Sequence, residues 1–105
     1  MSDLEDRLHA QLALAGFTAF KREFCAISGR RFRWDFAWPD NRLLVEVQGG
    51  AWNGGKHGRG SGIAKDTEKL NLAAIHGWRV MQFTSDQIRS GKALRWVQDW
   101  FRENS

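Results

Sequence analysis

The chain has 105 residues and one cysteine, which suits a single domain of residues 1–105 and excludes an internal disulfide or a zinc site built from several cysteines. No apolar run approaches the roughly 20 residues that span a bilayer, and the acidic N-terminus lacks a signal-peptide segment, so we expect a soluble, cytoplasmic protein with no membrane partner. A formal net charge of +4 suits a polyanionic partner such as nucleic acid.

The apolar pattern predicts an α/β fold with a mixed sheet, in the order α-β-β-β-α-β-α. The predicted elements are, in chain order, a helix at 3–15, strands at 17–26, 30–38 and 42–48, a helix at 62–76, a strand at 78–84 and a helix at 92–102. A turn at Pro39–Asp40–Asn41 joins two of the strands, and Ser85 is a candidate cap for a short helical turn before the last helix.

Acidic residues interrupt two strands that the sequence predicts to be neighbours. In the strand 30–38, strict alternation places the aromatic residues Phe32, Trp34, Phe36 and Trp38 on one face and Asp35 on the other. In the strand 42–48, alternation places Glu46 and Gln48 on one face. We therefore expect Asp35 and Glu46 to lie at matching depth across the two strands.

Two ionised carboxylates about 4–5 Å apart repel by roughly 3–4 kcal/mol at an effective dielectric near 20. A divalent cation would offset that repulsion, and Mg²⁺ takes carboxylate oxygens together with water and phosphate. The alternative is that Asp35 and Glu46 each pair with a base such as Arg31, Arg33 or a lysine. The Gln48 amide either orients a water or phosphate oxygen or is an ordinary edge residue.

The helix at 62–76 adds candidates. Asp66 falls on its apolar stripe, where a carboxylate needs a partner, and Lys69 lies three residues later. Lys69 would deliver an ammonium group to a phosphate, or it forms an ordinary helix pair with Asp66. In the N-terminal helix, Glu5 shares the stripe of Leu8 and points inward, or it has a structural or exposed role.

Residues 49–62 hold seven of the eleven glycines and do not match a phosphate-binding P-loop. We interpret this segment as a flexible basic flap that follows a nucleic-acid backbone. His57 would move a proton or bind phosphate there, or it is a plain loop histidine. The expected nucleic-acid contacts are Arg31, Arg33, Trp52, Lys56, Arg59 and Lys65, with a core position as the alternative for Trp52.

The sequence resembles the PD-(D/E)XK nuclease superfamily, whose core order is α-β-β-β-α-β. Asp35 matches the first acid of that family and Glu46–Val47–Gln48 matches its E-x-K element, with Gln48 in place of lysine. The resemblance implies a restriction-endonuclease-like core with a C-terminal helix. It also implies Mg²⁺ or Mn²⁺ held by Asp35, Glu46 and the Val47 carbonyl, and a lysine drawn from the following helix.

A narrower resemblance covers residues 30–90. The block 56–62, the helical Asp66 and Lys69, and Gly77–Trp78–Arg79–Val80 are similar to small phage-type nucleases related to very-short-patch repair and EDxHD homing endonucleases. In those relatives a helical Glu, a strand Asp, a loop His and a helical Asp build the site. By that pattern the counterparts here are Glu5, Asp35, His57 and Asp66.

The sequence therefore predicts a Mg²⁺-dependent nuclease that hydrolyses phosphodiester bonds in DNA, with endonuclease action as the expected mode. Its main alternative is an inactive nuclease-fold module that binds nucleic acid or a partner protein, which the missing lysine at Gln48 favours. A third alternative is a repair- or restriction-associated subunit that acts only as a homodimer, because a chain this small has limited grip on a duplex.

Overall fold

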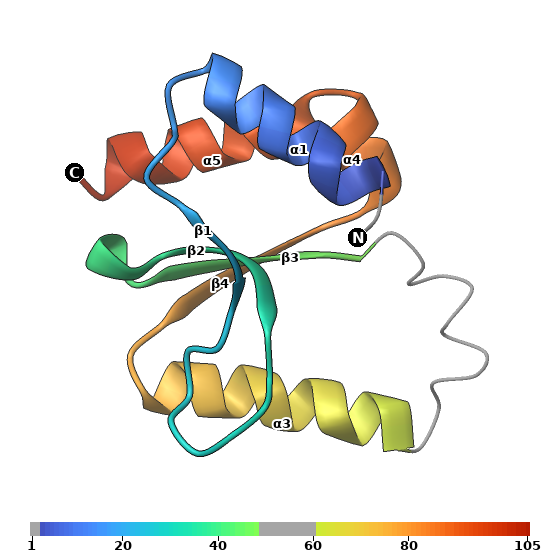
Figure 1. The fold of residues 1–105 in the computed structure, drawn as a ribbon, viewed down its shortest axis with the longest axis vertical. Helices are drawn as coiled ribbons and strands as arrows, with labels where there is room; N and C mark the ends of the chain where they lie inside the picture. Colours follow the sequence, from blue (N-terminus) through green and yellow to red (C-terminus); the bar gives the residue numbers. More distant parts are fainter. Residues whose placement is uncertain (1–2, 49–60) are drawn as a thin grey trace.

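The sheet has four strands in the spatial order β1-β2-β3-β4 (Figure 1). They belong to a computed structural model that describes residues 3–48 and 61–105. Neighbours β1/β2 and β2/β3 are antiparallel, whereas β3/β4 are parallel. The strands are β1 Lys21–Phe24, β2 Trp34–Trp38, β3 Leu43–Val47 and β4 Arg79–Phe83. The mixed α and β fold class predicted from the sequence is confirmed.

Helices cover both faces of the sheet (Figure 1). One face carries α1 (Asp3–Leu14), α4 (Ser85–Arg89) and α5 (Lys92–Glu103), and the other carries α3 (Ser61–Ile75). A short 3-10 helix, η1 (Pro39–Asn41), makes the predicted turn between β2 and β3. The predicted order of elements is confirmed, and the short helical turn predicted before the last helix is α4. Within the described ranges, no helix is both long and apolar enough to span a membrane.

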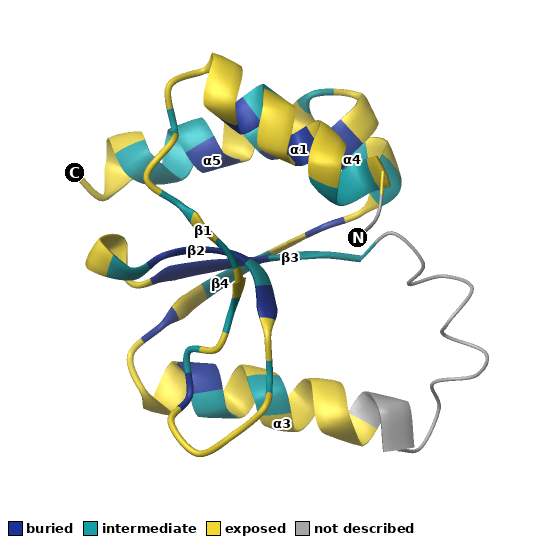
Figure 2. Ribbon diagram, viewed as in Figure 1, coloured by how far each residue is buried: buried dark blue, intermediate teal, exposed yellow. Residues whose placement is uncertain are grey.

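The sheet separates two apolar clusters (Figure 2). The larger cluster joins Leu8 and Leu12 of α1 with Val97 of α5 and the β2 residues Phe36 and Trp38. The smaller cluster, beneath α3, consists of Ile27, Trp34, Ala37, Leu44, Ala73 and Trp78. Because both faces of β2 and β3 are covered, these strands are almost fully apolar, and the few acids on them stand out.

Two sequence predictions about the strands are wrong in detail. The strands predicted at 17–26 and 30–38 are shortened to β1 and β2, and Trp34 does not share a face with Phe36. Trp34 packs in the cluster under α3, whereas Phe36 packs in the opposite cluster. A straight strand would place both on one face, and Figure 1 shows that β2 is curved, so the strict period-two alternation does not hold along it.

Thr84, rather than the predicted Ser85, caps α4. Its hydroxyl accepts the Gln87 N–H at 3.4 Å, and the Gln87 side chain accepts the Thr84 N–H at 2.9 Å. This reciprocal pair satisfies two N–H groups that the first turn of a helix leaves without partners. The capped turn reverses the chain after β4 and brings Ile88 into the larger cluster.

We expect Thr84→Ala to destabilise the fold by about 1 kcal/mol, because it removes the cap. Thermal unfolding followed by circular dichroism should show a Tm lower by about 4–8 °C. Ser85→Ala is the matched control and should leave Tm nearly unchanged. Equal effects of the two substitutions would contradict the assignment of the cap to Thr84.

Candidate functional site

The sheet divides at Asp35. The β2–β3 ladder ends at the pair Phe36↔Val45, whereas β2 stays paired with β1 as far as Phe24↔Trp34, and β3 stays paired with β4 as far as Val47↔Phe83. Beyond the last β2–β3 pair, the Asp35 Oδ2 accepts the Val47 N–H at 2.7 Å. The Asp35 carboxylate thus replaces the backbone acceptor that β3 loses where β2 bends away. We call the place where β2 and β3 separate, between Asp35 and Val47, the fork.

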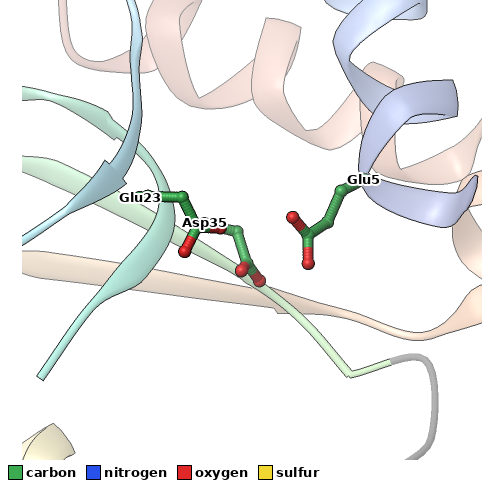
Figure 3. Close-up of side chains that lie close together, drawn as sticks. All are labelled: Glu5, Glu23 and Asp35. Atoms are coloured by element: carbon green, nitrogen blue, oxygen red, sulfur yellow. The ribbon is translucent and has the colours of Figure 1, made fainter. Parts of the chain in front are cut away.

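Two further carboxylates converge on Asp35 at the fork (Figure 3). Glu23 lies on β1, opposite Asp35 by the register of the ladder, and Glu5 extends from α1. One oxygen from each of the three acids lies within 4.8 Å of the others. Glu23 has a φ of 52°, a left-handed backbone that is uncommon outside glycine and that accompanies the bend.

Burial and the neighbouring groups shift the pKa of the Asp35 carboxyl. Burial raises its pKa, the Val47 N–H hydrogen bond lowers it, and repulsion from Glu46 and Glu23 raises it again. A contact with the Glu5 carboxyl acts to lower it. The net result is a pKa above the ordinary value, because desolvation and like charges disfavour the ionised form more than the hydrogen bonds favour it.

Lys69 of α3 pairs with Glu46 of β3 next to this acidic cluster. Its Nζ lies 2.6 Å from the Glu46 Oε2 and donates to the Arg33 carbonyl oxygen, also at 2.6 Å. The ammonium also lies 4.7 Å from the centroid of the Trp34 ring. The two charged side chains are only 14% and 21% exposed, so the pair is held in one geometry by its surroundings.

Arg22 of β1 contacts the acidic cluster through Glu5. Its guanidinium lies 3.3 Å from the Glu5 Oε1 and 2.8 Å from the His9 Nδ1, and it covers the Phe36 ring at 4.8 Å. Glu5 is therefore oriented by a cation that is itself fixed on the sheet. The prediction that Glu5 points inward is confirmed, since its side chain is 17% exposed.

Several predicted site residues meet in space. Asp35 and Glu46 are near enough for their charges to interact, but Glu46 pairs with Lys69, and Asp35 is grouped with Glu5. Val47 touches Asp35 through its N–H. The Gln48 N–H donates to the Phe83 carbonyl at 2.6 Å, which fixes the backbone where β3 ends.

Asp66 departs from its prediction. It is exposed, not buried against the sheet, and Lys69 pairs with Glu46 instead of with Asp66. Asp66 is two turns before the buried Ala73 and therefore lies on a similar side of α3, but Figure 1 shows the N-terminal half of α3 extending beyond β1 and β2. Helical spacing alone therefore does not bury the Asp66 carboxylate.

The predicted nucleic-acid contacts are only partly described. Arg31, Arg33 and Lys65 are exposed, and Arg31 and Lys65 line one groove. The predicted contacts and proton carrier in the glycine-rich segment lie outside the described residues: Trp52, Lys56, His57 and Arg59.

Sequence reasoning missed Glu23 and Arg22. Both lie on β1, and their importance depends on the register that sets Arg22 opposite Phe36 and so Glu23 opposite Asp35. The sequence Lys21–Arg22–Glu23–Phe24 looks like an ordinary solvated edge strand. Only knowledge of the strand pairing would have singled these two side chains out.

Comparisons of the chain with protein-family models, with curated proteins and with solved structures find no match.

The donor set at the fork fits a hard divalent cation. All the converging ligand atoms are carboxylate oxygens, which Mg²⁺, Mn²⁺ and Ca²⁺ prefer over softer metals. Burial, followed by repulsion from Glu46 and Glu23, raises the pKa of Asp35, and a bound cation would favour the ionised form. Glu5, Glu23 and Asp35 are therefore the described residues best placed to hold a metal ion.

We expect Asp35→Asn to stabilise the metal-free protein at neutral pH. The folded-state pKa of Asp35 lies above the ordinary value of 3.8, so folding binds its proton more tightly, and the resulting stability is lost as pH rises through the raised pKa. Asparagine can still accept the Val47 N–H but carries no charge. The free energy of unfolding, measured in a chelating buffer over a pH series, should favour the variant at neutral pH.

The advantage of Asp35→Asn should shrink as the pH falls through the raised pKa, because wild-type Asp35 then becomes neutral too. Asp99→Asn is the matched control, as it removes one partly exposed carboxylate on α5, which pairs with Arg102. A variant less stable than wild type at neutral pH would contradict the conclusion that burial and repulsion outweigh the Val47 hydrogen bond.

Proposed function

We propose that this protein is a metal-dependent nuclease that hydrolyses phosphodiester bonds in DNA, acting as an endonuclease. The observation that carries the proposal is the meeting of Glu5, Glu23 and Asp35 beside the Lys69–Glu46 pair. Phosphodiester hydrolysis requires that negative charge on the phosphate be stabilised, and a cation-binding carboxylate group next to a fixed ammonium suits that task.

Mg²⁺ or Mn²⁺ would be held by Asp35 together with Glu5 and Glu23. Glu46 and the Val47 carbonyl remain the further ligands that the resemblance to PD-(D/E)XK nucleases implies. When bound, the cation supplies Lewis acidity: it acidifies water and neutralises charge on the phosphate. Without it, burial together with repulsion from Glu46 and Glu23 raises the pKa of Asp35.

Lys69 would bind the phosphate. An ammonium has three N–H donors, and the described hydrogen bonds to Glu46 and Arg33 use two of them. The third would be donated to a phosphate oxygen at the fork. The ion pair with Glu46 holds the Lys69 ammonium in place, which makes Glu46 a positioning residue in addition to a candidate ligand. Gln48, next along β3, would orient a water or phosphate oxygen by hydrogen bonding, because its amide carries no charge.

The fold supports the proposed relationship to restriction-endonuclease-like proteins. The order α1-β1-β2-β3-α3-β4 is the order that the resemblance implies, and Asp35 and Glu46 flank the place where β2 and β3 part. In the E-x-K element, Gln48 replaces the expected lysine. Lys69 of α3 brings an ammonium to Glu46. The lysine missing at Gln48 was the reason for favouring a module that only binds nucleic acid, and Lys69 would take its place.

Cleavage of a mixed DNA panel tests the proposal. Supercoiled plasmid, linear duplex, single strand and four-way junction would be incubated with Mg²⁺ or Mn²⁺. We expect the wild type to cut at least one substrate, and Asp35→Asn to abolish cutting although the variant folds. Lys69→Met should lower the rate by about 100-fold or more, because it removes a preorganised positive group.

Matched controls on α5 separate a local effect from a loss of charge. Asp99→Asn and Lys92→Met change the same types of charge on the opposite side of the sheet from α3, and both should cut at the wild-type rate. A folded wild type that binds DNA yet cuts none of the panel with either metal would contradict the nuclease proposal. That result would favour the binding module instead.

A further inference from the structure

A groove of about 480 Å³ lies between the segment that precedes β2 and the N-terminal half of α3. Its volume falls in the range of sites that accept a small ligand, roughly 300–1,000 Å³. Its walls come from Gly29, Arg30, Arg31, Phe32, Lys65 and Glu68. The groove is separate from the acidic cluster at the fork, and its charge has the opposite sign.

Positive charge dominates the groove. Arg30 forms an ion pair with Glu68, so its charge is compensated. Arg31 and Lys65 are exposed, and neither forms an ion pair within the part of the chain that the structure describes. These two side chains are therefore placed to bind an anion such as a phosphate.

The groove also contains a flat, fixed surface. The Arg30 guanidinium lies 4.8 Å from the centroid of the Phe32 ring, and the pair to Glu68 holds it there. Phe32 packs against the smaller apolar cluster, so its ring is fixed in turn. Planar guanidinium and aromatic groups are the surfaces on which unpaired bases stack.

The groove adjoins the fork. Lys65 is one helical turn before Lys69 on α3, which is about 6 Å along the helix axis. On the other wall, Arg31 and Phe32 immediately precede Arg33, whose carbonyl oxygen accepts from Lys69. A DNA strand whose phosphate binds Lys69 would therefore place a neighbouring nucleotide over the groove.

We infer that this groove binds an unpaired nucleotide of single-stranded DNA, with its phosphate on Arg31 and Lys65 and its base stacked on the outer face of the Arg30 guanidinium, which lies over Phe32. The inference deepens the proposed function, because it makes the substrate a DNA with a single-stranded segment next to the cleaved bond. The base of a nucleotide in a continuous duplex is already stacked and paired, so it is not available to this surface.

Binding without cleavage tests the inference. Fluorescence anisotropy in EDTA would compare a labelled short oligothymidylate with a blunt duplex of equal length over a series of KCl concentrations. The double substitution Arg31→Gln/Lys65→Gln should weaken binding of the single strand by about tenfold or more. Its salt slope should also fall by about 0.7 for each lost phosphate contact.

Arg30→Lys separates stacking from charge. Lysine keeps the positive charge beside Glu68 but lacks the planar guanidinium. We expect single-strand affinity to fall about fivefold or more while the salt slope stays unchanged, because a stacking contact is lost and no phosphate contact is. The matched control for the double substitution is Lys92→Gln/Arg95→Gln, which removes two exposed charges from α5 and should have little effect.

Three results would overturn the inference: an equal loss with the α5 control, an equal loss of duplex binding, or unchanged affinity in Arg30→Lys. Because the assay contains no metal ion, it does not depend on the proposed reaction. If the expected binding losses appear but the wild type cuts no DNA with Mg²⁺ or Mn²⁺, the groove assignment stands and the nuclease proposal fails.

Discussion

The hydrogen bond from the Val47 N–H to the Asp35 carboxylate is the contact on which the site depends. Where β2 leaves β3, the Val47 N–H would otherwise lose its partner at a half-buried position, which costs free energy. A side-chain oxygen from the departing strand supplies the missing acceptor. The same bond fixes one Asp35 oxygen and leaves the carboxylate at the opening between the strands. The separation of β2 from β3 that ends their ladder thus also positions the Asp35 carboxylate.

The charges around this bond follow from the topology. The register brings Glu23 alongside Asp35 from one side, β3 brings Glu46 from the other, and α1 adds Glu5. In the described ranges, the ion pairs of this cluster are those of Lys69 with Glu46 and of Arg22 with Glu5 and Asp6. Asp35 and Glu23 have none, so negative charge is left over at the centre of the fork. A bound divalent cation is the simplest way to balance it.

Much of this arrangement was predictable from the sequence, and the misses have physical causes. The period of the apolar residues gave the element order, and the isolated acid Glu46 stood out in an apolar strand. The alternation that predicts one face for Trp34 and Phe36 assumes a straight strand, and the helical spacing that predicts an inward Asp66 does not show how closely the helix packs on the sheet. Glu23 was missed because strand register depends on contacts between distant residues. The sequence predicts that Lys69 acts near phosphate. It does not predict the pairing of Lys69 with Glu46, because that pairing depends on how α3 packs against the sheet.

The central claim is that the fork holds a divalent cation through Asp35. Diffraction from crystals grown with Mn²⁺, collected at the manganese absorption edge, tests it most directly, because the anomalous signal locates the ion without any assumption about activity. We expect an anomalous peak in contact with the Asp35 carboxylate and with Glu5 or Glu23. A folded protein that shows no peak at the fork, or that binds Mn²⁺ only elsewhere, would contradict the claim.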